Sequence, residues 1–305
     1  MKPSSRFAAA AGSQTRRAFL QTALAAAPAT AVSAAALAVP GSKPLRTAEG
    51  LIDVNVSLGQ WPTRRVRCDD SRELVARLRR LGVSQAWAGT LDGLLHKDIA
   101  AANNRLAKTC HQDGKGLLVP FGSINPKLPD WEEELRRCAD LHHMPGIRLH
   151  PNYHGYRLED PAFLRLIELA TQRRLIVQLA LIMEDERMMH PLFRVDPVDT
   201  APLRDLVQRV PGLRLVLLNV HRTLRAKPLL ELIAAGNVSV EIAMLEGVGG
   251  VGTLLAQMPG GRLLFGSHAP MFYFESALLK LKESALTPAQ SQAVGHGNAR
   301  HLLTS

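Results

Sequence analysis

The sequence predicts a (β/α)8 TIM barrel. After Gly50, short runs rich in β-branched and aliphatic residues alternate eight times with amphipathic stretches of helical period. Several of these runs are almost entirely apolar, as in residues 213–218, which is typical of strands in a parallel sheet covered by helices. Residues 51–305 also match the length of about 250 residues that such a barrel needs.

Eight strands are expected from the apolar runs. They are residues 51–58, 83–90, 117–124, 146–150, 175–181, 213–221, 238–243 and 262–267. The first strand differs from the others because polar and apolar residues alternate along it. Alternation places Asp53, Asn55 and Ser57 on one face of that strand.

Helical patterns fill the intervals between the strands. They are residues 71–81, 98–111, 131–139, 161–172, 201–210, 228–235 and 252–258. An open doubly wound sheet is the alternative fold, because residues 247–252 match the dinucleotide motif G-x-G-x-x-G. This motif follows the seventh strand, and no acidic residue ends the next strand to hold a ribose. In a barrel, the same loop either binds an anion or is a simple flexible turn.

The N-terminal 38 residues are expected to be an export signal. Residues 13–21 resemble a twin-arginine signal, and an alanine-rich apolar segment runs from there to Ala38. We expect cleavage before Val39, a linker over residues 39–50, and a barrel over residues 51–305. A membrane anchor is the alternative, but Pro28 and several polar residues make this segment a poor permanent span. The mature protein is therefore expected in the periplasm or secreted, exported already folded by the twin-arginine machinery.

Charge and cysteine content exclude some classes of protein. Removing Lys2, Arg6, Arg16 and Arg17 with the signal lowers the net charge from +10 to +6. The remaining arginines are scattered along helical patterns, without interleaved aromatics, so they indicate a solvated face and no nucleic-acid partner. The cysteines, Cys68, Cys110 and Cys138, have no CxxC spacing and allow one disulfide at most.

Polar residues gather at the ends of the predicted strands, where the active sites of barrels are found. Besides those of the first strand, they are Arg148 and His150, Gln178, Asn219 and His221, Glu241, and His268. Each of these side chains has a structural explanation by itself, such as a hydrogen bond to a neighbouring backbone group. Six strands that carry such groups are harder to explain without a shared pocket, because burying polar groups is costly.

These strand ends resemble the motifs of the amidohydrolase-related family along the whole expected barrel. The first strand is similar to its Asp-x-His-x-His motif, and residues 145–151 are similar to its fourth-strand motif. Residues 215–221 resemble its sixth-strand motif, which ends in histidine. Residues 263–270 resemble its Gly-Ser/Thr-Asp-x-Pro motif, and residues 297–303 resemble its C-terminal Gly-Asn-Ala helix.

The resemblance implies a metal-dependent hydrolase or decarboxylase acting on a small, anionic organic acid, a lactone or an amide. In such enzymes a divalent metal, here zinc or manganese, activates water and polarises the substrate carbonyl. The metal-binding positions differ in this chain, however. Asn55, Ser57 and Gln178 replace histidines and His268 replaces the aspartate, so that only His221 is kept. Neutral amide and hydroxyl oxygens are weak zinc ligands, so the usual metal site is not expected in its usual place.

Two functions remain open at this stage. In the first, the protein is an enzyme in which His221 and His268 act as catalytic bases, with or without one divalent metal. The substrate would then be bound by Asn55, Ser57, Arg148, Gln178 and Asn219. A rearranged metal site would use His150, His221, Glu241 and His268. In the second, the barrel is catalytically inactive and binds a small anion or a sugar acid.

Two loops are candidate walls of the pocket. Trp61, Arg64 and Arg65 follow the first strand, and Tyr153, His154 and Tyr156 follow the fourth. Ordinary packing of Trp61 and an exposed loop after the fourth strand are the alternatives.

Overall fold

A computed structural model describes residues 50–305, and the expected signal and nearly all of the linker lie outside these residues. Eight parallel strands follow one another around the sheet in sequence order. They are β1 (Leu51–Leu58), β2 (Val83–Thr90), β3 (Leu118–Ser123), β4 (Gly146–Leu149), β5 (Ile176–Ala180), β6 (Arg214–Leu218), β7 (Val238–Glu241) and β8 (Leu263–Leu264). Hydrogen bonds from Val54 N to Phe265 O (3.0 Å) and from Ser57 N to Ala269 O (2.8 Å) join the first strand to the last. The (β/α)8 barrel is therefore confirmed, and the open doubly wound sheet is wrong.

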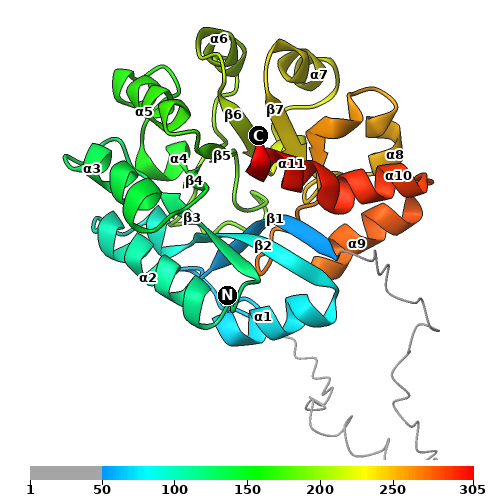
Figure 1. Ribbon diagram of the computed structural model, residues 1–305, viewed down its shortest axis with the longest axis horizontal. Helices are drawn as coiled ribbons and strands as arrows, with labels where there is room; N and C mark the ends of the chain where they lie inside the picture. Colours follow the sequence, from blue (N-terminus) through cyan, green and yellow to red (C-terminus); the bar gives the residue numbers. More distant parts are fainter. Residues whose placement is uncertain (1–49) are drawn as a thin grey trace, which may run out of the picture. The chain divides into compact units, whose positions relative to one another are not determined.

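Helices surround the strands in a ring (Figure 1). They are α1 (Ser71–Arg80), α2 (Ile99–Gln112), α3 (Trp131–Arg136), α4 (Pro151–His154), α5 (Pro161–Gln172), α6 (Leu203–Arg209), α7 (Ala226–Ala235), α8 (Gly250–Leu255), α9 (Phe274–Glu283), α10 (Pro288–Gln292) and α11 (Asn298–Thr304). The short α4 and the C-terminal α9 and α10 were not among the expected helices. The Gly-Asn-Ala segment forms the start of α11, which packs against β1 and β8. Among residues 50–305, no helix is long and apolar enough to cross a membrane.

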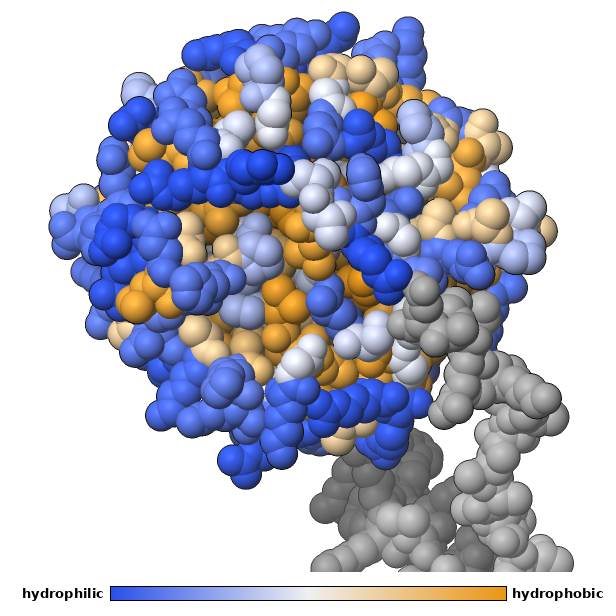
Figure 2. Space-filling view, viewed as in Figure 1, coloured by the Kyte–Doolittle hydropathy of each residue, from blue (hydrophilic) through white to orange (hydrophobic). Residues whose placement is uncertain are grey.

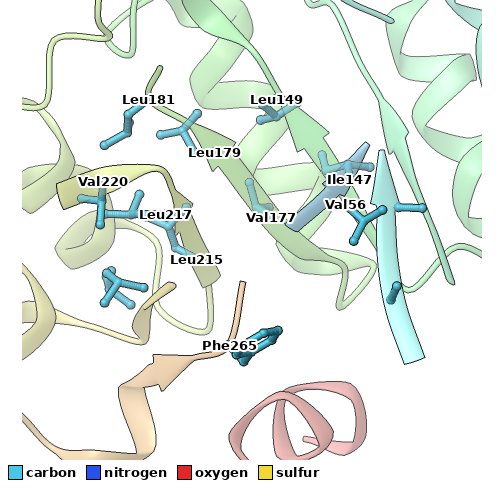
Figure 3. Close-up of a cluster of buried hydrophobic side chains, with 14 of the residues drawn as sticks. Val56, Ile147, Leu149, Val177, Leu179, Leu181, Leu215, Leu217, Val220 and Phe265 are labelled. Atoms are coloured by element: carbon cyan, nitrogen blue, oxygen red, sulfur yellow. The ribbon is translucent and has the colours of Figure 1, made fainter. Parts of the chain in front are cut away.

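Two apolar clusters pack on opposite faces of the strands. The larger cluster lies between the strands and the helices (Figure 3). It includes Ile147 and Leu149 of β4, Val177 and Leu179 of β5, and Leu215 and Leu217 of β6. The smaller cluster includes Trp87, Phe121, Ile176, Val216 and Leu264. On the face shown in Figure 2, hydrophilic residues cover the outer helices and hydrophobic residues are visible between them.

The first strand does not follow the simple alternation that we expected. Its pairing with β2 shifts register between Asp53 and Val56. Ile52 and Val54 belong to the smaller cluster, whereas Val56 belongs to the larger one. Because a register irregularity changes which face successive side chains reach, Asp53 and Asn55 have different partners. The register shift lies within the run that holds Asp53, Asn55 and Ser57, so their shared face stays a prediction.

Gly146, the first residue of β4, lies where no side chain fits. A Cβ atom there would lie 2.4 Å from the backbone oxygen of Ile176 and 2.4 Å from the ring of Phe121. We expect Gly146→Ala to lower the free energy of unfolding by about 1–3 kcal/mol, as overpacking of a core does. Gly260→Ala is the matched control, because its Cβ would meet nothing within 4 Å. Urea denaturation measures both variants, and equal unfolding midpoints for the two would contradict this prediction.

Candidate functional site

At the C-terminal ends of the strands, Asn55, Asn219 and Glu241 bind one another. Asn55 Nδ2 donates hydrogen bonds to Asn219 Oδ1 (3.0 Å) and to Glu241 Oε1 (3.3 Å). The backbone N–H of Asn219 donates to the same carboxylate oxygen at 2.6 Å, and Asn219 Nδ2 donates to Ile182 O at 2.7 Å. All three side chains are buried. Their polar atoms therefore satisfy one another, and residues from β1, β7 and the end of β6 are joined in one network.

Asn219 and His221 do not share a face, although both follow the sixth strand. β6 ends at Leu218, and Asn219 adopts a left-handed conformation with φ of 59°, which asparagine tolerates better than most residues. The chain then turns into a 3-10 helix, Val220–Arg222. His221 lines a cavity together with residues of α7 and α8. The residue at the end of β6 that faces the buried network is therefore Asn219, and the expected shared face is wrong.

Arg148 lies across the inside of the barrel and uses its guanidinium group on protein atoms. Its Nε donates to Gln178 Oε1 (2.8 Å), and its Nη1 donates to Val56 O (2.8 Å) and Ser57 Oγ (3.3 Å). Its Nη2 donates to Trp87 O at 3.0 Å. Gly89 of β2 makes room for this side chain, because a Cβ there would lie 2.7 Å from Arg148 Cδ.

The burial of Arg148 and its protein partners affect whether it can bind a substrate, which is the role predicted from the sequence. The side chain is 2% exposed, and burial lowers the pKa of Arg148 to about 10. Gln178 is also held in place, because its Nε2 donates to Val54 O at 2.7 Å. The roles of Ser57, Arg148 and Gln178 in substrate binding stay predictions, and in this structure all three bind the protein itself.

Asp53 forms a separate pair with Ser267, the residue that precedes His268. Ser267 N donates to Asp53 Oδ1 at 3.0 Å, and Ser267 Oγ donates to Asp53 Oδ2 at 2.5 Å. Burial raises the pKa of Asp53 to about 7, against the lowering effect of these hydrogen bonds. Burial also raises the pKa of Glu241. Two buried carboxyl groups with raised pKa values thus lie near the buried guanidinium of Arg148.

His268 and His150 are buried, and each has a ring nitrogen without a partner among the described residues. His268 has a φ of 58°, and its Nε2 lies 2.8 Å from the carbonyl oxygen of Met183. Its Nδ1 and the Nδ1 of His150 have no hydrogen-bond partner. Burial lowers the pKa of His268 and of His221 to about 4, and that of His150 well below its ordinary value. All three imidazoles are therefore neutral at pH 7, and each is a weaker base than a free histidine.

The residues present do not fit a metal ion. Among residues 50–305, no three histidine, cysteine, aspartate or glutamate side chains form a group that could hold one. His150, His221, Glu241 and His268 do not converge as the expected ligand set, because Glu241 binds Asn55 and Asn219 while His221 lines an outer cavity. The positions closest to the centre carry amides, which are weak ligands for zinc.

A cavity of about 350 Å³ opens among segments that follow the strands. Its walls come from the loop after β1 and the following helix α1, from the loop after β5, and from the segment after β8. Arg64, Arg65, Arg67 and Arg77 line one side, and Met183, Glu184 and Asp185 line another. None of Asn55, Gln178, Asn219 and Glu241 is among its lining residues.

The arginines that line this cavity differ in whether they form ion pairs. Arg64 Nη2 lies 2.8 Å from Glu184 Oε1, and Arg77 is paired with Glu275. The exposed Arg67 has no ion-pair partner in the part of the chain that the structure describes. The sequence predicts Arg64 and Arg65 as a candidate wall, and the structure adds Arg67 to it. Its approach to Arg77 and the β5 loop depends on the tertiary fold, so no local sequence signal could have found it.

Aromatic side chains from the segments that follow β1, β4 and β5 pack together. The ring of Trp61 lies 6.2 Å from that of Tyr153 and 6.0 Å from that of Phe193, measured between centroids. Trp61 is almost completely buried, in agreement with its interpretation as a packing residue. His154 is likewise bound to the protein, since its Nε2 lies 2.7 Å from Gly93 O.

The protein is a parallel (β/α)8 barrel, and buried polar side chains from several strands lie at the C-terminal ends of those strands. Residues 52–304 match the model of a protein family described as amidohydrolase. The chain belongs to this family. None of the curated proteins compared with the chain matches it in sequence.

Solved structures with the same fold include three decarboxylases. The 2,6-dihydroxybenzoate decarboxylase from Rhizobium is 14% identical, with a TM-score of 0.61, over 84% of this chain and 99% of that one. A dihydroxybenzoic acid decarboxylase from Polaromonas, with bound manganese, is 14% identical, with a TM-score of 0.61 over 84% and 97%. The 5-carboxyvanillate decarboxylase from Novosphingobium aromaticivorans, also with manganese, is 12% identical, with a TM-score of 0.63 over 84% and 96%. At these identities the likeness concerns the fold.

Proposed function

We propose that this chain binds a small organic acid at the C-terminal mouth of its barrel, without a metal ion. The observation that carries this proposal is that Asn55, which stands where the resemblance implies a metal-binding histidine, is hydrogen-bonded to Asn219 and Glu241. Gln178 is likewise occupied by Arg148. A metal would have to displace these bonds and would gain mainly neutral amide ligands, which is unfavourable.

The arginine-lined cavity supports the choice of an anionic ligand. Among the described residues, Arg67 forms no ion pair within 4 Å, and guanidinium groups bind carboxylates through paired hydrogen bonds. Met183, Met188 and Phe272 supply an apolar wall to the same cavity. A ligand with one carboxylate and an apolar body, such as an aromatic acid, matches this combination. The solved relatives named for dihydroxybenzoate decarboxylation are consistent with this ligand class.

Metal-independent hydrolysis or decarboxylation of such an acid is the second candidate function. Membership of the amidohydrolase family favours it, and so do the unpartnered Nδ1 atoms of His150 and His268. In this version His268 and His221 keep the catalytic roles expected from the sequence. Their lowered pKa values argue for weak bases, so we place binding ahead of catalysis.

We further propose that binding takes place in the periplasm or outside the cell after twin-arginine export. The support for this location is the sequence of residues 1–38 alone.

The test is to measure the binding of 2,6-dihydroxybenzoate by calorimetry, using protein purified without chelators and assayed for bound metals. We expect binding that EDTA does not change, weaker binding of the uncharged 2,6-dihydroxybenzamide, and no stoichiometric zinc or manganese. Arg67→Ala should weaken binding about three- to tenfold, as the loss of one guanidinium–carboxylate contact does. Arg72→Ala is the matched control, because this exposed arginine of α1 pairs with Asp113 outside the cavity.

The outcomes separate the candidates. Stoichiometric metal whose removal abolishes binding would contradict the metal-independent proposal. Release of carbon dioxide from the acid, lost in His268→Ala and retained in Arg72→Ala, would favour the catalytic version. Equal affinities for the acid and its amide would contradict the choice of an anionic ligand.

A further inference from the structure

The N-terminal end of the barrel carries an excess of exposed positive charge. Because the strands are all parallel, the segments that lead from the helices into the strands lie at this one end. Residues 79–82, 113–117, 173–175 and 209–213 are four of these segments. Their basic side chains are all exposed and together form what we call the basic face: Arg79, Arg80, Lys115, Arg173, Arg174 and Arg209.

Neighbouring acids do not neutralise the basic face. Asp113 is the only acidic residue in these four segments, and it is bound by Ser71 Oγ at 2.5 Å and Arg72 Nε at 3.1 Å. Among residues 50–305, no residue of the basic face forms an ion pair within 4 Å. The face therefore keeps a net positive charge that solvent ions or an anionic partner must balance.

The helix ends explain only part of this charge. Helix C-termini favour cations, which accounts for Arg80 at the end of α1 and Arg209 at the end of α6. Lys115 and Arg174 lie beyond the ends of their helices. The opposite end of the barrel also differs, because residues 181–202, which follow β5 there, contain more acidic residues than arginines. The excess is thus specific to the N-terminal end.

The chain enters the barrel beside the basic face. Leu51 N, at the start of β1, donates to Gly82 O at 2.9 Å, and Gly82 follows Arg80 by two residues. Residues 1–49 are therefore attached to the barrel at this end. Residues 1–38 are expected from the sequence to be an export signal, and such signals act at a membrane. A barrel held at a membrane through its N-terminal segment presents this end to the lipids.

The distribution of the charge favours a lipid surface over a nucleic acid. The cations come from segments after α1, α2, α5 and α6, so they are spread around the end of the barrel. The four segments contain no aromatic residue on which a base could stack. Anionic headgroups form an extended surface, where each nearby lysine or arginine raises affinity about fivefold.

We propose that the basic face binds the surface of a membrane containing anionic phospholipids. Guanidinium and ammonium groups contact the headgroup phosphates, and the attachment is peripheral and electrostatic. The arginine-lined cavity lies among segments that leave the strands at the other end, so it stays open to the solution. The inference does not depend on the proposed binding of an organic acid.

The test is co-sedimentation with phosphatidylcholine vesicles, either pure or with about 30% phosphatidylglycerol. Residues 39–305, the expected mature chain, should bind only the vesicles with phosphatidylglycerol, and about 1 M salt should abolish binding through screening. Arg173→Gln combined with Arg174→Gln should weaken binding about ten- to thirtyfold. Lys115→Gln combined with Arg209→Gln should have a similar effect.

Arg157→Gln combined with Arg194→Gln is the matched control. It removes the same charge from two exposed arginines in segments that leave β4 and β5 at the other end, and it should keep the unaltered affinity. Calorimetry with 2,6-dihydroxybenzoate should give the same result for Arg173→Gln with Arg174→Gln as for the unaltered protein. Failure of vesicle binding and failure of acid binding are therefore separate outcomes.

Three results would overturn the proposal. The first is equal sedimentation with both kinds of vesicle. The second is an equal loss of binding in the control and in the variants of the basic face, which would show that only net charge matters. The third is tighter binding to transfer RNA than to phosphatidylglycerol vesicles at the same salt concentration, which would favour a nucleic acid.

Discussion

Arg148→Ala is expected to lower the free energy of unfolding by about 3–5 kcal/mol, the typical cost of removing one member of a buried polar network. The substitution removes the donors to Gln178, Ser57 and the backbone oxygens of Val56 and Trp87. It also leaves a cavity where a fully packed side chain had been. Both effects destabilise the folded state, and urea denaturation at pH 7 measures their sum.

Two further variants show which effect is responsible. Arg148→Met keeps most of the volume of the side chain, so its loss of stability reports mainly on the missing hydrogen bonds. Arg72→Ala, at a side chain that is 83% exposed, should change stability by less than about 1 kcal/mol. If Arg148→Ala unfolds at the same urea concentration as Arg72→Ala, the guanidinium network does not stabilise the barrel. A stable Arg148→Ala protein that has lost acid binding would instead support a direct role of Arg148 in the ligand site.

The second large effect is expected from Asp53→Asn and depends on pH. The pKa of Asp53 is raised by burial from its ordinary 3.8 to about 7 in the folded protein. Between these pH values the folded state binds a proton that the unfolded state has released, so stability falls as pH rises through this range. Each pKa unit corresponds to about 1.4 kcal/mol, which makes the full effect about 4 kcal/mol. Asparagine does not ionise and avoids this loss.

We therefore expect the stability of Asp53→Asn relative to the unaltered protein to increase by about 3–4 kcal/mol between pH 4 and pH 8. The lowered pKa values of His221 and His268 act in the opposite direction, because their neutral forms stabilise the folded state as pH rises from about 4 to 6.5. Both proteins share these histidines, so their effect cancels in the difference. Urea denaturation of both proteins at several pH values gives the measurement.

Glu133→Gln is the control with the opposite sign. A hydrogen bond from Arg136 lowers the pKa of the exposed Glu133, so its ionised form stabilises the folded state. Loss of that carboxylate should make the variant slightly less stable relative to the unaltered protein as pH rises. A stability difference for Asp53→Asn that does not change with pH would show that Asp53 ionises normally in the folded protein.

Much of the fold could be predicted because its signals are local. The apolar runs and their helical spacers depend only on neighbouring residues, and they located all eight strands. The sixth strand shows where this reasoning stops. Its apolar run suggested a strand as far as His221, but the chain leaves the strand after Leu218. Asn219 then adopts a left-handed conformation that the apolar pattern cannot reveal.

The candidate site could be predicted only as a set of residues. The polar groups were predicted from the ends of the apolar runs, and most of them are buried in the structure. Their partners were not predictable, because Asn55 meets Asn219 and Glu241 across more than 160 residues of sequence. The position of Arg67 at the mouth cavity likewise required the loops after β1, β5 and β8 to be placed in space.

The sequence by itself determined the closed parallel barrel and the loss of the histidines expected as metal ligands, because strand periodicity and residue identity are written directly in the chain. The tertiary structure alone decided that Asn55 and Asn219 fill the centre while His221 lines an outer cavity. The physical reason is that a register shift in β1 and left-handed residues at Asn219 and His268 rotate side chains after the regular strand pattern has ended. Those rotations depend on packing against distant strands, which no local pattern records.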